Sequence, residues 1–274
     1  MLITRKPRRE LQPFVRSLWA VRRDHDVQSP LPYERVLPTG DMRLVFRVTN
    51  QPIRIASAKT ELFQTLHSCV IGGSRASCYL RETPATVYTV GIELRPGASL
   101  SLFGTPAEEL SDRHTNLADI WHKSNVEDIV SQLSEAPSAE EQLRLAEDVL
   151  LKRLSRVRGM HPAIAQALKD FSGASDIRNT VKQSGYSHRR FIALFKEAVG
   201  QTPKTYARIL RFKEAVHLLA EDSNISLANL SLQAGYSDQP HLNREFRRLS
   251  GMTPQQYREA KRSSSHCLRT LTPQ

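Results

Sequence analysis

Hydrophobic side chains in the second half of the chain recur with the period of an α-helix. Phe191, Leu194, Phe195 and Ala198 follow the i, i+3, i+4, i+7 spacing that places side chains on one helix face. Residues 204–222 are apolar at helical intervals and contain no glycine or proline, which predicts one continuous helix. We therefore expect the second half of the chain to be all-helical.

The first half of the chain follows the shorter periods of β-structure. Residues 16–23 and 33–48 alternate or run apolar, and the second stretch is interrupted by turn residues at 38–41. Residues 85–94 form a further apolar run that ends at Arg95, Pro96 and Gly97. Short helices should follow at 99–103 and from Pro106, which has acidic residues in the first turn after it.

An internal repeat divides the helical half into two copies of one module. The stretch 185–206 recurs at 235–257, with one residue inserted in the second copy. Two copies are too few for a solenoid, so we interpret them as a duplicated small unit. The identities, in chain order, pair Gly185 with Gly235, Tyr186 with Tyr236, Ser187 with Ser237, Phe195 with Phe246, Gly200 with Gly251, Thr202 with Thr253, Pro203 with Pro254 and Tyr206 with Tyr257.

Each copy is predicted to fold as helix, tight turn, helix. Gly185 and Gly235 end the first helix of each copy, because glycine accepts the left-handed conformation of a C-terminal cap. Ser187 can cap the second helix of its copy, and Ser237 or Asp238 can do so in the other. The continuous helix between the copies spans roughly 26 Å, so both outward helices could enter successive major grooves about 34 Å apart.

Length and composition place these elements in two ordinary domains. At 274 residues and 39% hydrophobic content, the chain can bury a core in each of two domains. We expect an α+β chain with a β-rich regulatory domain at residues 1–158 and an all-α domain at residues 159–274. Three cysteines are too few for a disulfide framework, and neither a secretory signal nor a membrane-length apolar stretch is present, which favours the cytoplasm.

The positive charge is concentrated in the helical half. The net charge of the whole chain is +11, and residues 160–274 contribute 17 basic and nine acidic side chains to it. A surplus confined to one domain favours binding to nucleic acid, although a solvated basic surface would look the same in composition. The repeat makes double-stranded DNA the better interpretation.

The helical half resembles the DNA-binding region of the AraC family of bacterial transcription regulators. The stretch AGYSDQPHLNREFRRLSGMTPQQYR at 234–258 follows the family signature nearly throughout, and Arg211, Ala215, Leu218 and Leu219 fit its linker helix. The resemblance implies two helix-turn-helix motifs joined by a long helix, from about Pro162 to Lys261. It also implies that the protein binds a DNA operator and RNA polymerase. The implied function includes activation of transcription.

The resemblance assigns base-reading positions to the outward face of each second helix. The first copy departs from the family pattern at Thr180, and Ile192 and Ala193 can read only apolar features such as a thymine methyl. A solvated helix would carry a similar polar face. The base-reading positions are Arg189, Ile192, Ala193, Gln239, Asn243 and Arg244, and the positions flanking them toward phosphate are His188, Arg190, Lys196, His241 and Arg247.

The first half is similar to the sensory domain of one AraC-family subgroup. The similarity lies in LPTGDMRLVF at 37–46 and in residues 91–112, and it implies a small-molecule effector without naming one. If the domain senses, Trp19, Phe46, Tyr88 and Glu93 are candidates for the effector pocket, although filling the core is the more common role for each of them. The helix at 138–157 carries Leu143, Leu150 and Leu154 as a stripe for a homodimer, or for packing against its own domain.

No enzymatic or metal-binding motif is found in the sequence. His114 and His122 lack ligand spacing on one helix face, and P-loop, GxGxxG and GxSxG patterns are absent. Cys69 and Cys78 could form a redox pair, but buried thiols are the more common outcome. We therefore expect no cofactor and no enzyme. The expected function is an effector-controlled, DNA-binding regulator; the alternatives are a constitutive regulator with a dimerising first domain and a regulator fused to a small-molecule enzyme.

Overall fold

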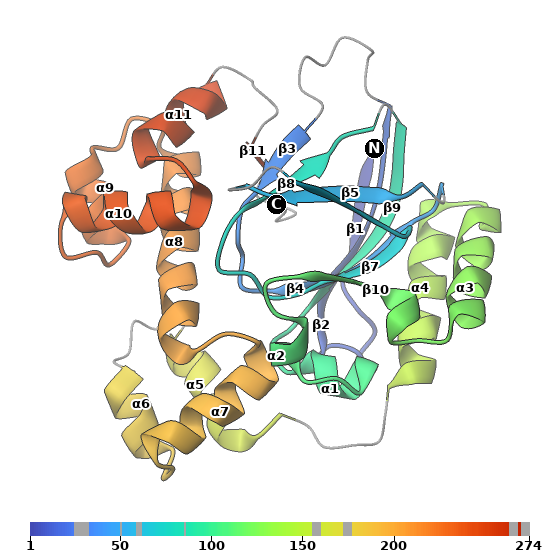
Figure 1. Cartoon of the computed structure of the whole chain (residues 1–274), viewed down its shortest axis with the longest axis horizontal. Coiled ribbons are helices and arrows are strands. Elements are labelled where there is room, and N and C mark those ends of the chain that lie inside the picture. The colour runs from blue at the N-terminus through green and yellow to red at the C-terminus, as the bar shows by residue number, and fades with distance from the viewer. Residues whose placement is uncertain are drawn as a thin grey trace.

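The computed structural model describes residues 1–24, 33–49, 51–58, 62–84, 86–154, 160–171, 177–262 and 268–269. Two β-sheets with their covering helices form the N-terminal part, and the C-terminal part is helical (Figure 1). The boundary predicted at residues 158 and 159 lies outside the described residues, as does Cys267. Within the described ranges, no helix combines the length and the apolar content that crossing a membrane requires.

The first sheet has six antiparallel strands in the order β1-β2-β9-β4-β7-β10. Its strands β2, β4 and β9 come from the segments predicted at 16–23, 33–48 and 85–94. The segment 33–48 also supplies β3 of the second sheet. The strands are β1 (Leu2–Arg5), β2 (Val15–Asp24), β4 (Met42–Arg47), β7 (Cys69–Gly72), β9 (Thr86–Leu94) and β10 (His114–Asn116).

The second sheet has five strands in the order β11-β3-β8-β5-β6 and faces the first across an internal cavity. Its pairs are antiparallel except for β11 with β3, where the C-terminal end of the chain returns to the N-terminal part. The strands are β3 (Tyr33–Val36), β5 (Ile53–Ser57), β6 (Phe63–Leu66), β8 (Tyr79–Glu82) and β11 (Leu268–Arg269).

The largest hydrophobic core lies on the outer face of the six-stranded sheet. Leu44 and Phe46 of β4 and Ile92 of β9 point to this face and are fully buried. Helices cover the face, and α3 and α4 lie side by side on it at the right of Figure 1. The helices that contribute to this core are α1 (Ala98–Phe103), α2 (Ala107–Leu110), α3 (Lys123–Glu135) and α4 (Ala139–Arg153).

The apolar stripe of α4 packs against its own domain. Leu143 and Leu150 have no exposed surface, and Leu154 is partly buried against the same core. Glu147 on this helix is also buried and forms ion pairs with Arg5 and Arg8 near the first strand. The face predicted for a partner copy is therefore occupied by the chain's own sheet, which corrects the dimer prediction for these leucines.

The helical part contains two helix-turn-helix units joined by one long helix, as the repeat predicts. Each unit has its own hydrophobic cluster, and α8 contributes Tyr206 to one cluster and Phe212 to the other. Gly185 and Gly235 end the first helix of each unit with φ of 71° and 74°. The helices are α5 (Pro162–Phe171), α6 (Ile177–Gln183), α7 (His188–Val199), α8 (Pro203–Glu221), α9 (Leu227–Gln233), α10 (Gln239–Ser250) and α11 (Pro254–Arg262).

Both helix-turn-helix units are attached to the sheet domain. Helix α2 packs against α7, and the amide of Gly97 donates to the carbonyl of Ala198 at 2.8 Å. At the other unit, the amide of Cys78 donates to the carbonyl of Leu249 near the end of α10, also at 2.8 Å. Figure 1 shows α8 running vertically between the two units, beside the sheets.

Candidate nucleic-acid interface and internal cavity

Helix α7 presents a basic face to solvent at its N-terminal end. The side chain of Ser187 caps the helix by accepting from the amide of Arg190 at 3.3 Å, and Phe191 and Phe195 bury the opposite face. Arg189 is exposed on this end of the helix. The neighbouring predicted positions differ in exposure: His188, Arg190 and Ala193 are exposed, whereas Ile192 is half-buried.

One predicted phosphate contact of α7 is engaged elsewhere in this structure. The ammonium of Lys196 lies 3.5 Å from the carboxylate of Glu108 on α2, and both side chains are partly exposed. The pair joins the first helix-turn-helix unit to the sheet domain, so Lys196 faces a carboxylate in this arrangement. Its role toward phosphate stays a prediction.

Helix α10 presents the second predicted reading face. Asp238 caps it by accepting from the amide of His241 at 2.6 Å, and this hydrogen bond is the main cause that lowers the pKa of Asp238. The ring of His241 lies 3.0 Å from the hydroxyl of Ser237, so it supports the turn as well as the surface. Gln239, Arg244 and Arg247 are exposed, and Asn243 is half-buried.

The amide oxygen of Asn243 has no solvent contact and no hydrogen-bond donor among the described residues. A buried amide oxygen without a donor is unfavourable, so the side chain gains if a partner is supplied or if it turns outward. Bidentate pairing of Asn with an adenine edge would supply such partners. The position is therefore suited to contact a base after a rotamer change.

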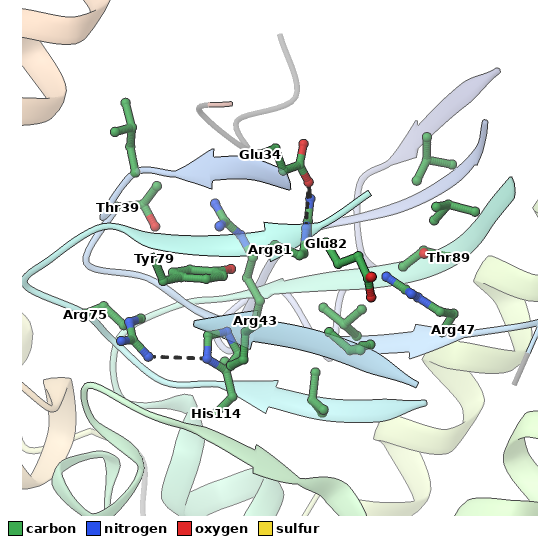
Figure 2. A pocket seen from close by; sticks show the side chains of 18 of the residues that line it. Glu34, Thr39, Arg43, Arg47, Arg75, Tyr79, Arg81, Glu82, Thr89 and His114 are labelled. Carbon is green, nitrogen blue, oxygen red and sulfur yellow. Dashed lines mark hydrogen bonds and ion pairs between the residues drawn. The ribbon is translucent and has the colours of Figure 1, made fainter. Parts of the chain in front are cut away.

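A cavity of about 260 Å³ lies between the two sheets and is lined by unusually many charged side chains. Arg43 and Arg47 of β4 and Arg81 of β8 point into it, as Figure 2 shows. Arg75 and His114 lie at one end, where Nη1 of Arg75 donates to Nδ1 of His114 at 3.3 Å. Apolar side chains of Val45, Ile53, Ile55, Val70 and Val87 complete the wall.

Burial controls the ionisation of the groups around this cavity. It lowers the pKa of His114 to about 3, with further lowering by Arg75 and Arg81, so the ring is neutral at physiological pH. Burial also lowers the pKa of Arg47 to about 10, and the neighbouring Arg81 adds to that shift. The pKa of Arg75 is lowered by burial as well.

Only one of the four predicted effector residues lies on the cavity wall. Trp19 lines the cavity and packs over Gly91, where a Cβ atom would overlap its ring. Phe46 and Tyr88 belong to the outer face of the same sheet, because successive side chains of a strand alternate between its faces. Glu93 is buried and pairs with Arg43 at 3.6 Å but does not line the cavity.

The arginines and His114 at this site are not predicted from the sequence as ligand-binding residues. In the strand sequence MRLVFR at 42–47, alternate positions place Met42, Leu44 and Phe46 on one face and both arginines with Val45 on the other, so the signal was present. Phe46, an effector candidate, lies on the apolar face, which in most sheet domains meets the interior. In this fold the apolar face meets helices, and the arginine face meets the cavity.

Two family profiles match the chain. A profile described as a helix-turn-helix domain matches residues 180–260, which span α7, α8, α9 and α10. A profile described as a domain of unknown function (DUF6597) matches residues 3–116 in the sheet domain. The helix-turn-helix profile is of the AraC type. The helix-turn-helix part of this chain is therefore similar to that of AraC-type transcription regulators.

The curated relatives that match this chain are named as regulators of transcription. The HTH-type transcriptional regulator ArgR of Pseudomonas aeruginosa is 27% identical over 123 residues, which cover 43% of this chain and 37% of the relative. The F1 operon positive regulatory protein of Yersinia pestis is 37% identical over 78 residues, which cover 28% of this chain and 26% of the relative. The chain thus matches well under half of the length of each of these relatives.

Among solved structures, apo ToxT from Vibrio cholerae aligns with 93% of this chain and with 99% of its own, at 12% identity and a TM-score of 0.45.

Proposed function

We propose that this protein is a sequence-specific, DNA-binding regulator of transcription of the AraC type. The observation that carries the proposal is the pair of helix-turn-helix units on the single rigid helix α8, each with a basic, outward-facing second helix. A helix of 19 residues is roughly 28 Å long, close to the pitch that separates successive major grooves. One chain therefore supplies two reading helices for one side of a duplex.

The residues assigned to base reading lie in the N-terminal halves of α7 and α10, where all but the half-buried Ile192 and Asn243 are exposed. The guanidinium groups of Arg189 and Arg244 can hydrogen-bond to guanine, and the side-chain amides of Gln239 and Asn243 can hydrogen-bond to adenine. Ile192 and Ala193 can contact the methyl group of thymine. The residues assigned to phosphate are His188, Arg190, Lys196, His241 and Arg247. Transcription activation through contact with RNA polymerase, and a cytoplasmic site of action beside DNA, are part of the same proposal.

Selection of binding sites from random duplex DNA by the purified full-length protein tests this function. We expect enrichment of a site with two elements about 10 base pairs apart, because the two reading helices lie on one side of the helix axis. Affinity for that site should fall linearly with the logarithm of salt concentration, since phosphate contacts release counterions. Recovery of no common sequence, or of a single element only, would contradict the proposal.

The internal cavity favours effector control over constitutive DNA binding. A domain that serves only for assembly has no need of an internal cavity lined by charged groups, whereas small-molecule sites combine a concave apolar wall with a few polar groups. A constitutive regulator is the second candidate. Ligand-dependent change in the melting temperature of the protein separates the two candidates, because only a ligand that binds the folded state raises it.

A further inference from the structure

The two helix-turn-helix units differ in how the sheet domain meets their second helices. Lys196 of α7 and Arg247 of α10 are equivalent positions of the repeat, because each directly follows one of the aligned residues Phe195 and Phe246. Arg247 is exposed and has no ion pair among the described residues. The ammonium of Lys196 lies 3.5 Å from the carboxylate of Glu108 on α2. One of two equivalent cations is therefore already paired with a carboxylate of the sheet domain.

The C-terminal end of α7 is held against α2 by more than this ion pair. The hydroxyl of Ser111 donates to the carbonyl of Gly200, and a Cβ atom on Gly200 would lie only 2.6 Å from the Oγ of Ser111. Gln201 is 6% exposed and its side-chain amide donates to the carboxylate of Asp112 at 3.1 Å. These contacts fix the backbone beside α2, so Lys196 stays next to the acidic residues of that helix.

The first turn of α2 places two carboxylates beside the reading helix. Glu108 and Glu109 both lie in this turn, and Glu109 is exposed with no ion pair in the part of the chain that the structure describes. Lys196 must leave Glu108 before its ammonium can pair with a phosphate. The side chains of Lys196 and Glu108 are each 42% exposed, so the pair is weak enough for DNA to break.

We propose that Glu108 is an autoinhibitory residue, whose carboxylate competes with DNA phosphate for Lys196 and so lowers the affinity of the first helix-turn-helix unit for DNA. The proposal rests on the proposed function for the contact of α7 with DNA. It follows that any rearrangement that separates α2 from α7 strengthens DNA binding. The second unit has no such restraint at Arg247.

Two neighbouring substitutions in the full-length protein test the proposal. Glu108→Gln and Glu109→Gln each remove one negative charge from α2, but only the first removes the partner of Lys196. Anisotropy titrations on the selected duplex and on a scrambled duplex measure their affinities. We expect Glu108→Gln to bind both duplexes about twofold to fivefold more tightly, because an exposed ion pair no longer has to be broken. Equal effects of the two substitutions, or weaker DNA binding by Glu108→Gln, overturn the proposal.

The salt dependence of DNA binding separates competition from a general effect of charge. In the unaltered protein, a phosphate that pairs with Lys196 releases a counterion while Glu108 takes one up, so the two contributions nearly cancel. Glu108→Gln abolishes the uptake, so the slope of log affinity against log salt should steepen by about 0.9, the value for one phosphate of B-DNA. Glu109→Gln should steepen the slope less. An unchanged slope for Glu108→Gln overturns the proposal.

Lys196→Gln completes the comparison. In the unaltered background it should change the salt slope little, whereas in the Glu108→Gln background it should reduce the slope by about one phosphate. In the Lys196→Gln protein, Glu108→Gln should have no more effect than Glu109→Gln, because the competed cation is gone. A full gain of affinity from Glu108→Gln without Lys196 would show repulsion alone and would refute the competition. Thermal unfolding verifies that these surface variants are folded.

The two duplexes distinguish this inference from the proposed function. A gain on a scrambled duplex by a protein that selects no common site would refute the sequence-specific regulator and leave the competition intact. Selection of a site, with Glu108→Gln and Glu109→Gln alike, would refute the competition alone. A protein that binds neither duplex would refute both.

Discussion

At the scale of single residues, the two exposed arginines of α10 should have different effects on DNA binding. Arg244→Ala should lower affinity for the selected site by about 1 to 3 kcal/mol and leave affinity for a scrambled duplex nearly unchanged, because it removes a base-edge contact. Arg247→Ala is the matched control: it should weaken both duplexes alike and reduce the salt dependence by about one phosphate. Fluorescence anisotropy titrations at several salt concentrations measure both. An equal loss on both duplexes for Arg244→Ala would contradict its base-reading role.

The sequence identified residues whose role depends on local backbone geometry. Gly185 and Gly235 were expected at the turns and have positive φ, and Ser187 and Asp238 cap the following helices as predicted. The cavity residues could not be assigned in this way, because their role depends on which face of a strand meets which layer. That is decided by packing between segments far apart in the chain.

At the scale of elements, the cap of α7 gives a prediction about stability. Ser187→Ala should lower the free energy of unfolding by about 1 kcal/mol, since it removes the acceptor for the amide of Arg190. Ser187→Asn should largely restore stability, because Asn is a comparable N-cap. Urea unfolding measures both variants. Equal losses for Ala and Asn would show that the serine acts by another contact.

The cap of α10 predicts a pH dependence that α7 lacks. The folded-state pKa of Asp238 is lowered, chiefly by the hydrogen bond from the amide of His241, so the unfolded chain binds more protons near the ordinary pKa of about 3.9. The stabilisation is complete above that value and is lost as the pH falls through the folded-state pKa. Asp238→Asn should therefore flatten this part of the stability curve below about pH 4. An unchanged acid limb would contradict the assignment.

Whether a segment forms a helix or a strand was predictable where its own hydrophobic periodicity was long enough to show the period. The helix predicted at 204–222 is α8 (Pro203–Glu221), and the strand predicted at 85–94 is β9 (Thr86–Leu94). Short strands such as β5, β6 and β8 were not identified, since four or five residues show too little period and their pairing is long-range. The apolar stripe of α4 was recognised from the sequence. The periodicity of a helix, however, does not show which surface will cover its apolar face.

At the scale of the whole molecule, the cavity and the reading helices share supporting segments. Asp41 lines the cavity and also binds Lys213 of α8, while Gly40 lies against Tyr206 and Ile209 of the same helix. Gln201, between α7 and α8, donates to the carbonyl of Ser74 at 3.0 Å and to Asp112 at 3.1 Å. A change in the cavity wall can therefore alter how α8 packs against the sheet domain. Coupling between two sites requires contacts that differ between two arrangements of the protein, and these contacts of α8 could supply that difference.

The ion pair between Asp41 and Lys213 is the clearest place to test that docking. The carboxylate of Asp41 is 2% exposed, so Lys213→Met leaves a buried charge whose only remaining ionic partner among the described residues is Arg16, and should lower stability. Because the pair joins two domains, the loss should also separate their unfolding, giving a broader or divided calorimetric transition. Lys204→Met removes the same charge from an exposed position on α8 and should leave the single transition unchanged. If both variants unfold alike, Lys213 does not hold the domains together, and another contact, such as that of Gln201, must carry the coupling.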